Sequence, residues 1–177
     1  MPAAPAPRAH FIALSTYAGL PALAPPHAAL FCDVLAGFRE RLGFRLHAYV
    51  VLPARAGLVV ATADGDPRSV RQLTRGLTAR YARELHTLSG WPGRIFRDPV
   101  GVAGVPTAAA IARRAAALHR LPVLAGLAPR PSAWPWSSAG AWTGRGLPPA
   151  PVDLPEEAMG GQPGEGEAPA GGGAVSG

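Results

Sequence analysis

The sequence predicts an α+β domain whose core is one antiparallel sheet covered by helices. Two observations lead to this fold class, and a third indicates where the domain ends. Apolar residues make up 48% of the 177 residues, which is a globular composition. Strand-like runs alternate with two amphipathic helices in the order β-α-β-β-α-β. From about residue 146 the chain becomes rich in Pro, Gly, Glu and Ala without any period.

The first half of the chain supplies a strand, a helix and a hairpin. Residues 10–17 are mostly apolar or β-branched and predict the first strand. Residues 27–42 carry apolar side chains at three- and four-residue spacing, and Gly43 follows as a stop, so they predict a helix. Two short apolar runs, 44–52 and 58–62, lie close together and predict an antiparallel hairpin.

The second half supplies a second helix, a fourth strand and a third helix. Residues 67–88 show an apolar stripe at helical period, with arginines at other positions. Residues 94–100 predict the fourth strand, and residues 107–119 predict an alanine-rich helix with Thr107 as its cap. This order is that of the ferredoxin-like fold, one antiparallel sheet with helices on one face, followed here by an extra C-terminal helix.

The composition divides the chain into three parts. Residues 1–9 are expected to be a flexible leader, and residues 10–145 to form one domain. Residues 146–177 are expected to be a disordered, acidic Gly/Pro-rich tail. Such a segment buries too little apolar surface to offset the entropy that ordering it would cost.

Charge is distributed unevenly along the chain. All 17 basic residues are arginine, and together with six acids they give residues 1–150 a net charge of +11. Residues 151–177 carry five acids and no base. A strongly basic body is typical of nucleic-acid-binding proteins. The alternative interpretation is that a GC-rich genome, with its arginine codons, supplied many of these side chains.

Several other classes of protein are disfavoured. A single cysteine, Cys32, can form neither an internal disulfide nor a zinc knuckle, and its apolar neighbours predict that it is buried. No signal peptide is visible, and no apolar run reaches the ~18 residues of a membrane span. We therefore expect a cytoplasmic protein without a membrane partner.

Four segments together resemble one enzyme family. They are Leu-His-Ala-Tyr-Val-Val-Leu-Pro at 46–53, Leu-Thr-Arg-Gly-Leu-Thr-Ala-Arg-Tyr-Ala-Arg at 73–83, Leu-Pro-Val-Leu-Ala-Gly-Leu at 121–127 and Trp-Pro-Trp-Ser-Ser-Ala at 134–139. In this order they are similar to segments of the single-tyrosine HUH transposases, in particular the REP-associated tyrosine transposase branch. The resemblance implies a transposase-like DNA-binding domain, with the same β-α-β-β-α-β order.

The resemblance also implies what the chemistry would require. In that family two histidines on one strand hold a divalent metal such as magnesium or manganese, and a tyrosine on a later helix attacks the DNA phosphate. At the two histidine positions this chain has Arg55 and Gly57, and at the tyrosine position it has Ala117. We therefore expect no metal cofactor and no catalytic residue, and a protein unable to cleave or join DNA.

Other residues of the right types are present and leave a rearranged active site open. They are His10, His47, His119, Tyr17, Tyr49 and Tyr81. Alternation predicts that His47 and Tyr49 share one face of the sheet. Tyr81 lies on the apolar stripe of its helix, which predicts a core position. His119 is placed near a helix C-terminus, where the helix dipole favours histidine.

Two functions then compete, beside a transposase that stays active through a rearranged site. In the first, the chain binds hairpin or single-stranded DNA. The candidate DNA-binding residues are Arg55, Arg71, Arg75, Arg80 and Arg83. In the second, it is a degenerate structural or interaction domain without DNA binding. Convergence of these arginines around the old active site would favour the first, and even scatter the second. Trp134 and Trp136 are expected to pack as a closing element, with a base-stacking platform as the alternative. The resemblance leaves the oligomeric state open.

Overall fold

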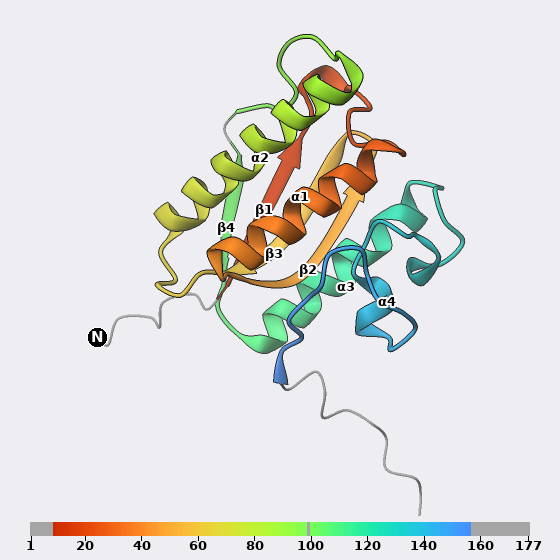
Figure 1. Ribbon diagram of the computed structural model, residues 1–177. Coiled ribbons are helices and arrows are strands. Elements are labelled where there is room, and N and C mark those ends of the chain that lie inside the picture. The colour runs from red at the N-terminus through yellow and green to blue at the C-terminus, as the bar shows by residue number, and fades with distance from the viewer. Residues whose placement is uncertain (1–8, 99, 157–177) are drawn as a thin grey trace, which may run out of the picture.

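The computed structural model describes residues 9–98 and 100–156, which form a four-stranded antiparallel sheet in the order β2-β3-β1-β4. The strands are β1 (Ala9–Ser15), β2 (Arg45–Leu52), β3 (Arg55–Ala61) and β4 (Gly101–Val105). This strand order, reached through one helix after β1 and another after β3, is that of the ferredoxin-like fold. The predicted fold class is confirmed (Figure 1).

Helices cover both faces of the sheet. They are α1 (His27–Leu42), α2 (Pro67–Ser89), α3 (Ala108–Leu124) and the short α4 (Ala139–Trp142), with 3₁₀ turns η1 (Tyr17–Gly19) and η2 (Pro131–Ala133). Helices α1 and α2 lie side by side on one face, as predicted for the helices of the β-α-β-β-α-β unit. Helix α3, the extra C-terminal helix, packs on the opposite face (Figure 1).

The alternation of side chains along the strands produces two separate cores. On β3, Leu58 and Val60 point toward α1 and α2, and Val59 points toward α3. Both groups are buried, which explains why the central strands are apolar at consecutive positions. The α3 face of the sheet is therefore a packed surface.

The ends of the helices follow their capping residues. Asp66 precedes α2 and accepts a hydrogen bond from the Arg68 backbone, and Gly90 ends the helix with a positive φ of 64°. Thr107 caps α3 through the Ala110 backbone, as predicted. Helix α3 continues five residues beyond its predicted end at His119, because its last turns are held against the sheet and the closing segment.

The predicted fourth strand at 94–100 is wrong. In that segment Phe96 forms only an isolated bridge with Thr16. The paired strand is β4, which runs antiparallel to β1 with Val105 opposite Ala9. The sequence itself disfavours a strand over 94–100, because Pro99 has no backbone N–H to donate to a ladder.

The predicted domain boundary at residue 145 is too early. Ala150 is completely buried, and its backbone N–H donates to the Tyr49 hydroxyl over 3.0 Å. The Asp153 carboxylate accepts hydrogen bonds from the Arg39 guanidinium, at 2.6 and 3.1 Å, and from the Leu46 backbone at 3.0 Å. This segment is held by specific polar contacts rather than by a periodic apolar face. The rest of the predicted tail, from residue 157, and residues 1–8 of the predicted leader lie outside the described residues.

A second C-terminal segment closes the outer side of β2. The Val51 backbone donates to the Trp136 carbonyl at 2.8 Å, and the Trp134 indole donates to the Val51 carbonyl at 2.9 Å. The backbone of Ser138 donates to the Tyr49 carbonyl at 3.0 Å. Both tryptophans are half-buried against the sheet, so the prediction of a packed closing element is confirmed.

Two further sequence expectations concern burial and hydrophobicity. Cys32 is on the buried side of α1, and burial raises the pKa of its thiol to about 12. Among the helices of the described residues, none combines the length and the hydrophobicity that crossing a membrane requires.

Candidate nucleic-acid interface

The two positions that would carry the metal-binding histidines lie on β3 and point toward α3. Gly57 is buried there, directly beneath Leu118 of α3. A Cβ atom added to Gly57 would lie 2.4 Å from Leu118 Cδ2 and 3.3 Å from Phe11 Cε2. A histidine at this position would require at least the Leu118 side chain to move. The space that a metal ligand would need is filled by a leucine.

Arg55 is the first residue of β3 and is exposed. It lies opposite Ser15 on β1 and Leu52 on β2. Because alternate residues of a strand point to the same face, Arg55 and Gly57 share the α3 face. Arg55 forms no ion pair with any carboxylate of residues 9–98 and 100–156.

The position of the family's tyrosine is also on the α3 side. Ala117 is exposed, one residue before Leu118, and lines a hollow of about 220 Å³ between α3 and β4. Arg113 and Arg114 line the same hollow, and the Arg114 guanidinium carbon lies 4.5 Å from the centre of the Phe11 ring. The α3 face thus combines basic side chains with an alanine where the nucleophile would be.

The three histidines of the rearranged-site alternative do not meet. His10 is buried on the face of the sheet that α2 covers. Neither of its ring nitrogens has a hydrogen-bond partner among the described residues. His47 Nδ1 bonds to the Asp153 carbonyl at 2.6 Å, and His119 Nε2 bonds to the Ser138 hydroxyl at 2.8 Å. In the described part of the chain no three His, Cys, Asp or Glu side chains gather closely enough to hold a metal ion.

Two predictions about these histidines are corrected. His47 and Tyr49 do not share a face, because a β-bulge between Leu46 and Ala48 shifts the register of β2. His47 therefore lines a hollow with α3, whereas Tyr49 lies in the core beneath α1. His119 is not at a helix end. It is buried within α3, and this burial lowers its pKa to about 4.

The tyrosines are divided between core and surface. Tyr81 is fully buried, as predicted, and its hydroxyl donates to the Ala22 carbonyl. Tyr49 is also fully buried, and burial raises the pKa of both phenols. Tyr17 is 54% exposed, in the turn after β1. None of the three lies on α3, where the family's tyrosine would be.

The five arginines expected to contact DNA are not gathered at one point. Arg71 and Arg75 line the same groove beside α2. Arg80 is paired with Glu84 and lies on the α1 side of the helix, and Arg83 is exposed outside this groove. Arg55 is on the other face of the sheet. They neither converge around the Arg55, Gly57 and Ala117 positions nor scatter evenly, because two of them share one hollow.

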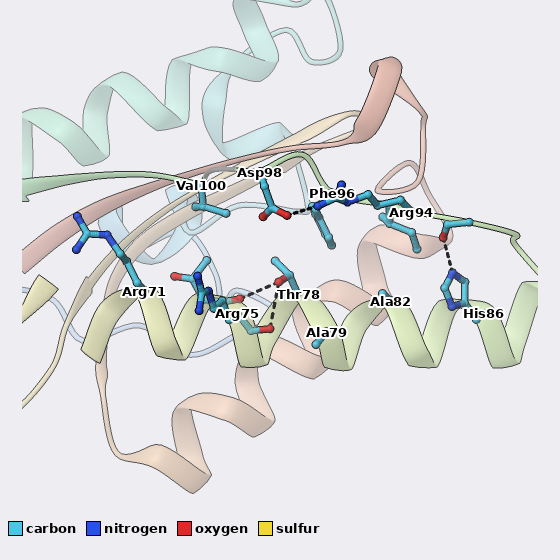
Figure 2. Close-up of a pocket in the computed structure, with 13 residues that line it drawn as sticks. Arg71, Arg75, Thr78, Ala79, Ala82, His86, Arg94, Phe96, Asp98 and Val100 are labelled. Carbon is cyan, nitrogen blue, oxygen red and sulfur yellow. Dashed lines mark hydrogen bonds and ion pairs between the residues drawn. The ribbon is translucent and has the colours of Figure 1, made fainter. Parts of the chain in front are cut away.

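That groove lies between α2 and the segment leading into β4, and its volume is about 650 Å³. Figure 2 shows Arg71 and Arg75 at one end of the α2 wall and His86 at the other. Arg94 on the opposite wall pairs with Asp98, and His86 Nε2 bonds to the Gly93 carbonyl at 2.9 Å. The sequence prediction missed Arg94, because its segment was expected to be a regular strand.

Comparisons with known proteins identify the fold. No protein-family model matches the chain, and no curated protein sequence matches it. A solved structure of a REP-associated tyrosine transposase bound to a REP hairpin is similar, with a TM-score of 0.61 and 16% sequence identity. The similarity covers 95% of this chain and 93% of that chain. The chain therefore has a transposase-like fold over nearly its whole length.

Proposed function

We propose that this chain is a DNA-binding protein derived from a single-tyrosine transposase, and that it holds DNA without cleaving or joining it. The observation that carries the proposal is the contact between Gly57 and Leu118. A glycine and a leucine pack together where the transposase pattern would place a metal ligand.

The residues present do not fit a catalytic metal. Magnesium or manganese would need neutral imidazoles or oxygen ligands at positions 55 and 57. Arg55 instead carries a fixed positive charge, and Gly57 offers no side-chain ligand. Ala117 has no hydroxyl to attack a phosphate. Each of these three differences removes a separate requirement of the reaction.

The charge of the described domain supports DNA as the partner. Residues 9–156 contain 16 arginines and eight acids, a net charge of +8. The similar transposase was solved with a DNA hairpin bound. We propose the same class of partner here, hairpin or single-stranded DNA. Of the five arginines expected from the sequence, we propose Arg55, Arg71 and Arg75 as its contacts, because Arg80 is paired with Glu84 and Arg83 lies outside the groove beside α2.

The test combines a binding assay with a search for a covalent adduct. Labelled hairpin DNA is titrated with the full chain at several salt concentrations, and the same mixtures with manganese are run on a denaturing gel. We expect affinity that falls steeply with salt, because arginine–phosphate contacts release counterions, and we expect no adduct. A protein–DNA adduct would show an active enzyme with a rearranged site.

A single substitution tests the role of Arg55. If its guanidinium contacts a phosphate, Arg55→Ala weakens hairpin binding and lowers the salt slope by about 1. Exposed Arg130, at the start of η2, provides the matched control, Arg130→Ala. If the wild-type chain does not bind DNA even at low salt, the proposal is wrong and the structural-domain alternative is favoured.

A further inference from the structure

The groove beside α2 has a basic rim. Arg71 and Arg75 extend from α2, and Arg94 extends from the segment across the groove (Figure 2). Arg94 is paired with Asp98, whereas Arg71 and Arg75 form no ion pair within residues 9–98 and 100–156. The uncompensated positive charge of the groove therefore lies at the Arg71 end.

The arginines are also the main hydrogen-bond donors of the groove. The Thr74 hydroxyl donates to the Val70 carbonyl at 2.7 Å, and the Thr78 hydroxyl donates to the Thr74 carbonyl at 3.0 Å. These protons are therefore not available to an incoming anion. A phosphate entering the groove would be bound through guanidinium groups, which match phosphate oxygens in charge and in geometry.

Between the charged groups the lining is apolar. Ala79 and Ala82 contribute from α2, and Phe96 and Val100 from the facing segment. A groove with a charged rim and an apolar lining matches a single nucleic-acid strand, which exposes sugars and base faces as well as phosphates. A duplex turns its charged backbone outward and leaves the apolar lining without a partner.

The groove is elongated along the helix. Its α2 wall runs from Arg71 to His86, and the 15 steps between these two residues span about 22 Å at 1.5 Å per residue. A single inorganic anion would occupy only a small part of this length. A chain of several nucleotides would follow it.

We infer that this groove binds the backbone of a single-stranded segment of nucleic acid, with Arg71 and Arg75 contacting its phosphates. The inference rests on the proposed function, because it assigns the place and form of the DNA that the chain holds. It also puts the binding groove on the α1–α2 side of the sheet, away from the Arg55, Gly57 and Ala117 positions.

The same helix provides a matched control. Arg80 and Arg83 carry the same charge as Arg71 and Arg75, but neither lines the groove. The double variants Arg71→Ala/Arg75→Ala and Arg80→Ala/Arg83→Ala therefore lower the net charge equally. Any difference between them reports position rather than total charge.

Fluorescence anisotropy with a labelled single-stranded oligonucleotide and the matching blunt duplex is the measurement. We expect the groove double variant to lose on the order of tenfold in single-strand affinity at low salt, and its salt slope to fall by about 1.4. The control double variant should lose much less. Wild type should prefer the single strand over the duplex.

A third variant should act in the opposite direction. Asp98→Asn removes the carboxylate from the groove and frees Arg94, so single-strand binding should tighten and its salt slope should rise by about 0.7. A gain of affinity cannot arise from misfolding. Unchanged binding by this variant would contradict a phosphate in the groove.

The remaining outcomes separate the two claims. If wild type binds but the two double variants weaken equally, the groove is not the site, although DNA binding stands. If wild type binds the duplex as tightly as the single strand, the inferred occupant is wrong. If wild type binds neither at low salt, the proposed function fails and this inference fails with it.

Discussion

At the scale of single residues, Gly57 determines what the α3 face of the sheet can accommodate. Because glycine has no Cβ atom, the Leu118 side chain occupies the space directly above its backbone. The two residues thus form a complementary pair, and changing either one alters the fit between β3 and α3. A packed interior resists added atoms as well as removed ones.

A double-mutant cycle tests this pairing. Gly57→Ala should destabilise the fold by about 1–3 kcal/mol through overpacking, and Leu118→Ala by about 2–5 kcal/mol through a cavity. In the double variant the new methyl group enters the space that leucine leaves. Its destabilisation, measured by urea unfolding, should therefore be smaller than the sum by about 1 kcal/mol or more. Simple additivity would show that the two side chains do not compete for space.

The buried His119 makes stability depend on pH. Burial lowers its pKa from 6.5 to about 4, and its ring bonds to the Ser138 hydroxyl. Between these two pH values the unfolded chain binds a proton that the folded chain does not. The free energy of unfolding should therefore fall as the pH drops from 6.5 toward 4, by roughly 3 kcal/mol from this group.

Urea unfolding of the wild type and of His119→Gln, at several pH values from 7.5 to 4.5, checks this expectation. Glutamine does not titrate, so the variant should lose stability less steeply as the pH falls. Equal slopes for the two proteins would mean that His119 takes up its proton without unfolding.

At the scale of secondary structure, local patterns predicted the elements that local interactions define. The spacing of apolar residues and Gly43 gave the observed bounds of α1, and Asp66 with Gly90 explains why α2 was predicted within one residue. The contact of His47 with Asp153 and the packing of Ala150 against Tyr49 join residues about 100 positions apart. No periodicity in a single sequence reveals such contacts.

The C-terminal segment that carries Ala150 and Asp153 is expected to stabilise the domain. Chains truncated after Gly146 and after Glu156 both lack residues 157–177, so their difference isolates this segment. The shorter chain should be less stable by about 2–5 kcal/mol, because it exposes the core and leaves the Leu46 amide without its acceptor. Thermal and urea unfolding measure it. Equal stability would mean that the segment contributes no net energy.

At the scale of the whole molecule, charge was predictable from the sequence but its placement was not. The surplus of arginine indicated a nucleic-acid partner. Which arginines share a surface depends on the pairing of β1 with β4 and on the segment before it, which places Arg94 in the same groove as Arg71 and Arg75. The helical period alone did not distinguish Arg80 and Arg83 from Arg71 and Arg75.

The acidic residues after Glu156 should weaken association with DNA. Truncation after Glu156 removes three glutamates and no base, which raises the net charge from +6 to +9. Binding of hairpin DNA should tighten at low salt, and the difference should shrink as salt screens the charges. Anisotropy titrations of both chains measure it. Equal or weaker binding by the truncated chain at low salt would exclude electrostatic screening by these residues.

The contact between Asp153 and the start of β2 also has a consequence for synthesis on the ribosome. Leu46 and Asp153 are 107 residues apart. At about 5–20 residues per second, roughly 5–20 s pass between the translation of the two residues. During that interval the nascent chain lacks Ala150, which packs against Tyr49, and the Asp153 carboxylate, which binds Arg39. The final closure of this domain is therefore among its latest folding events, and a chaperone that binds exposed strands has several seconds in which to act.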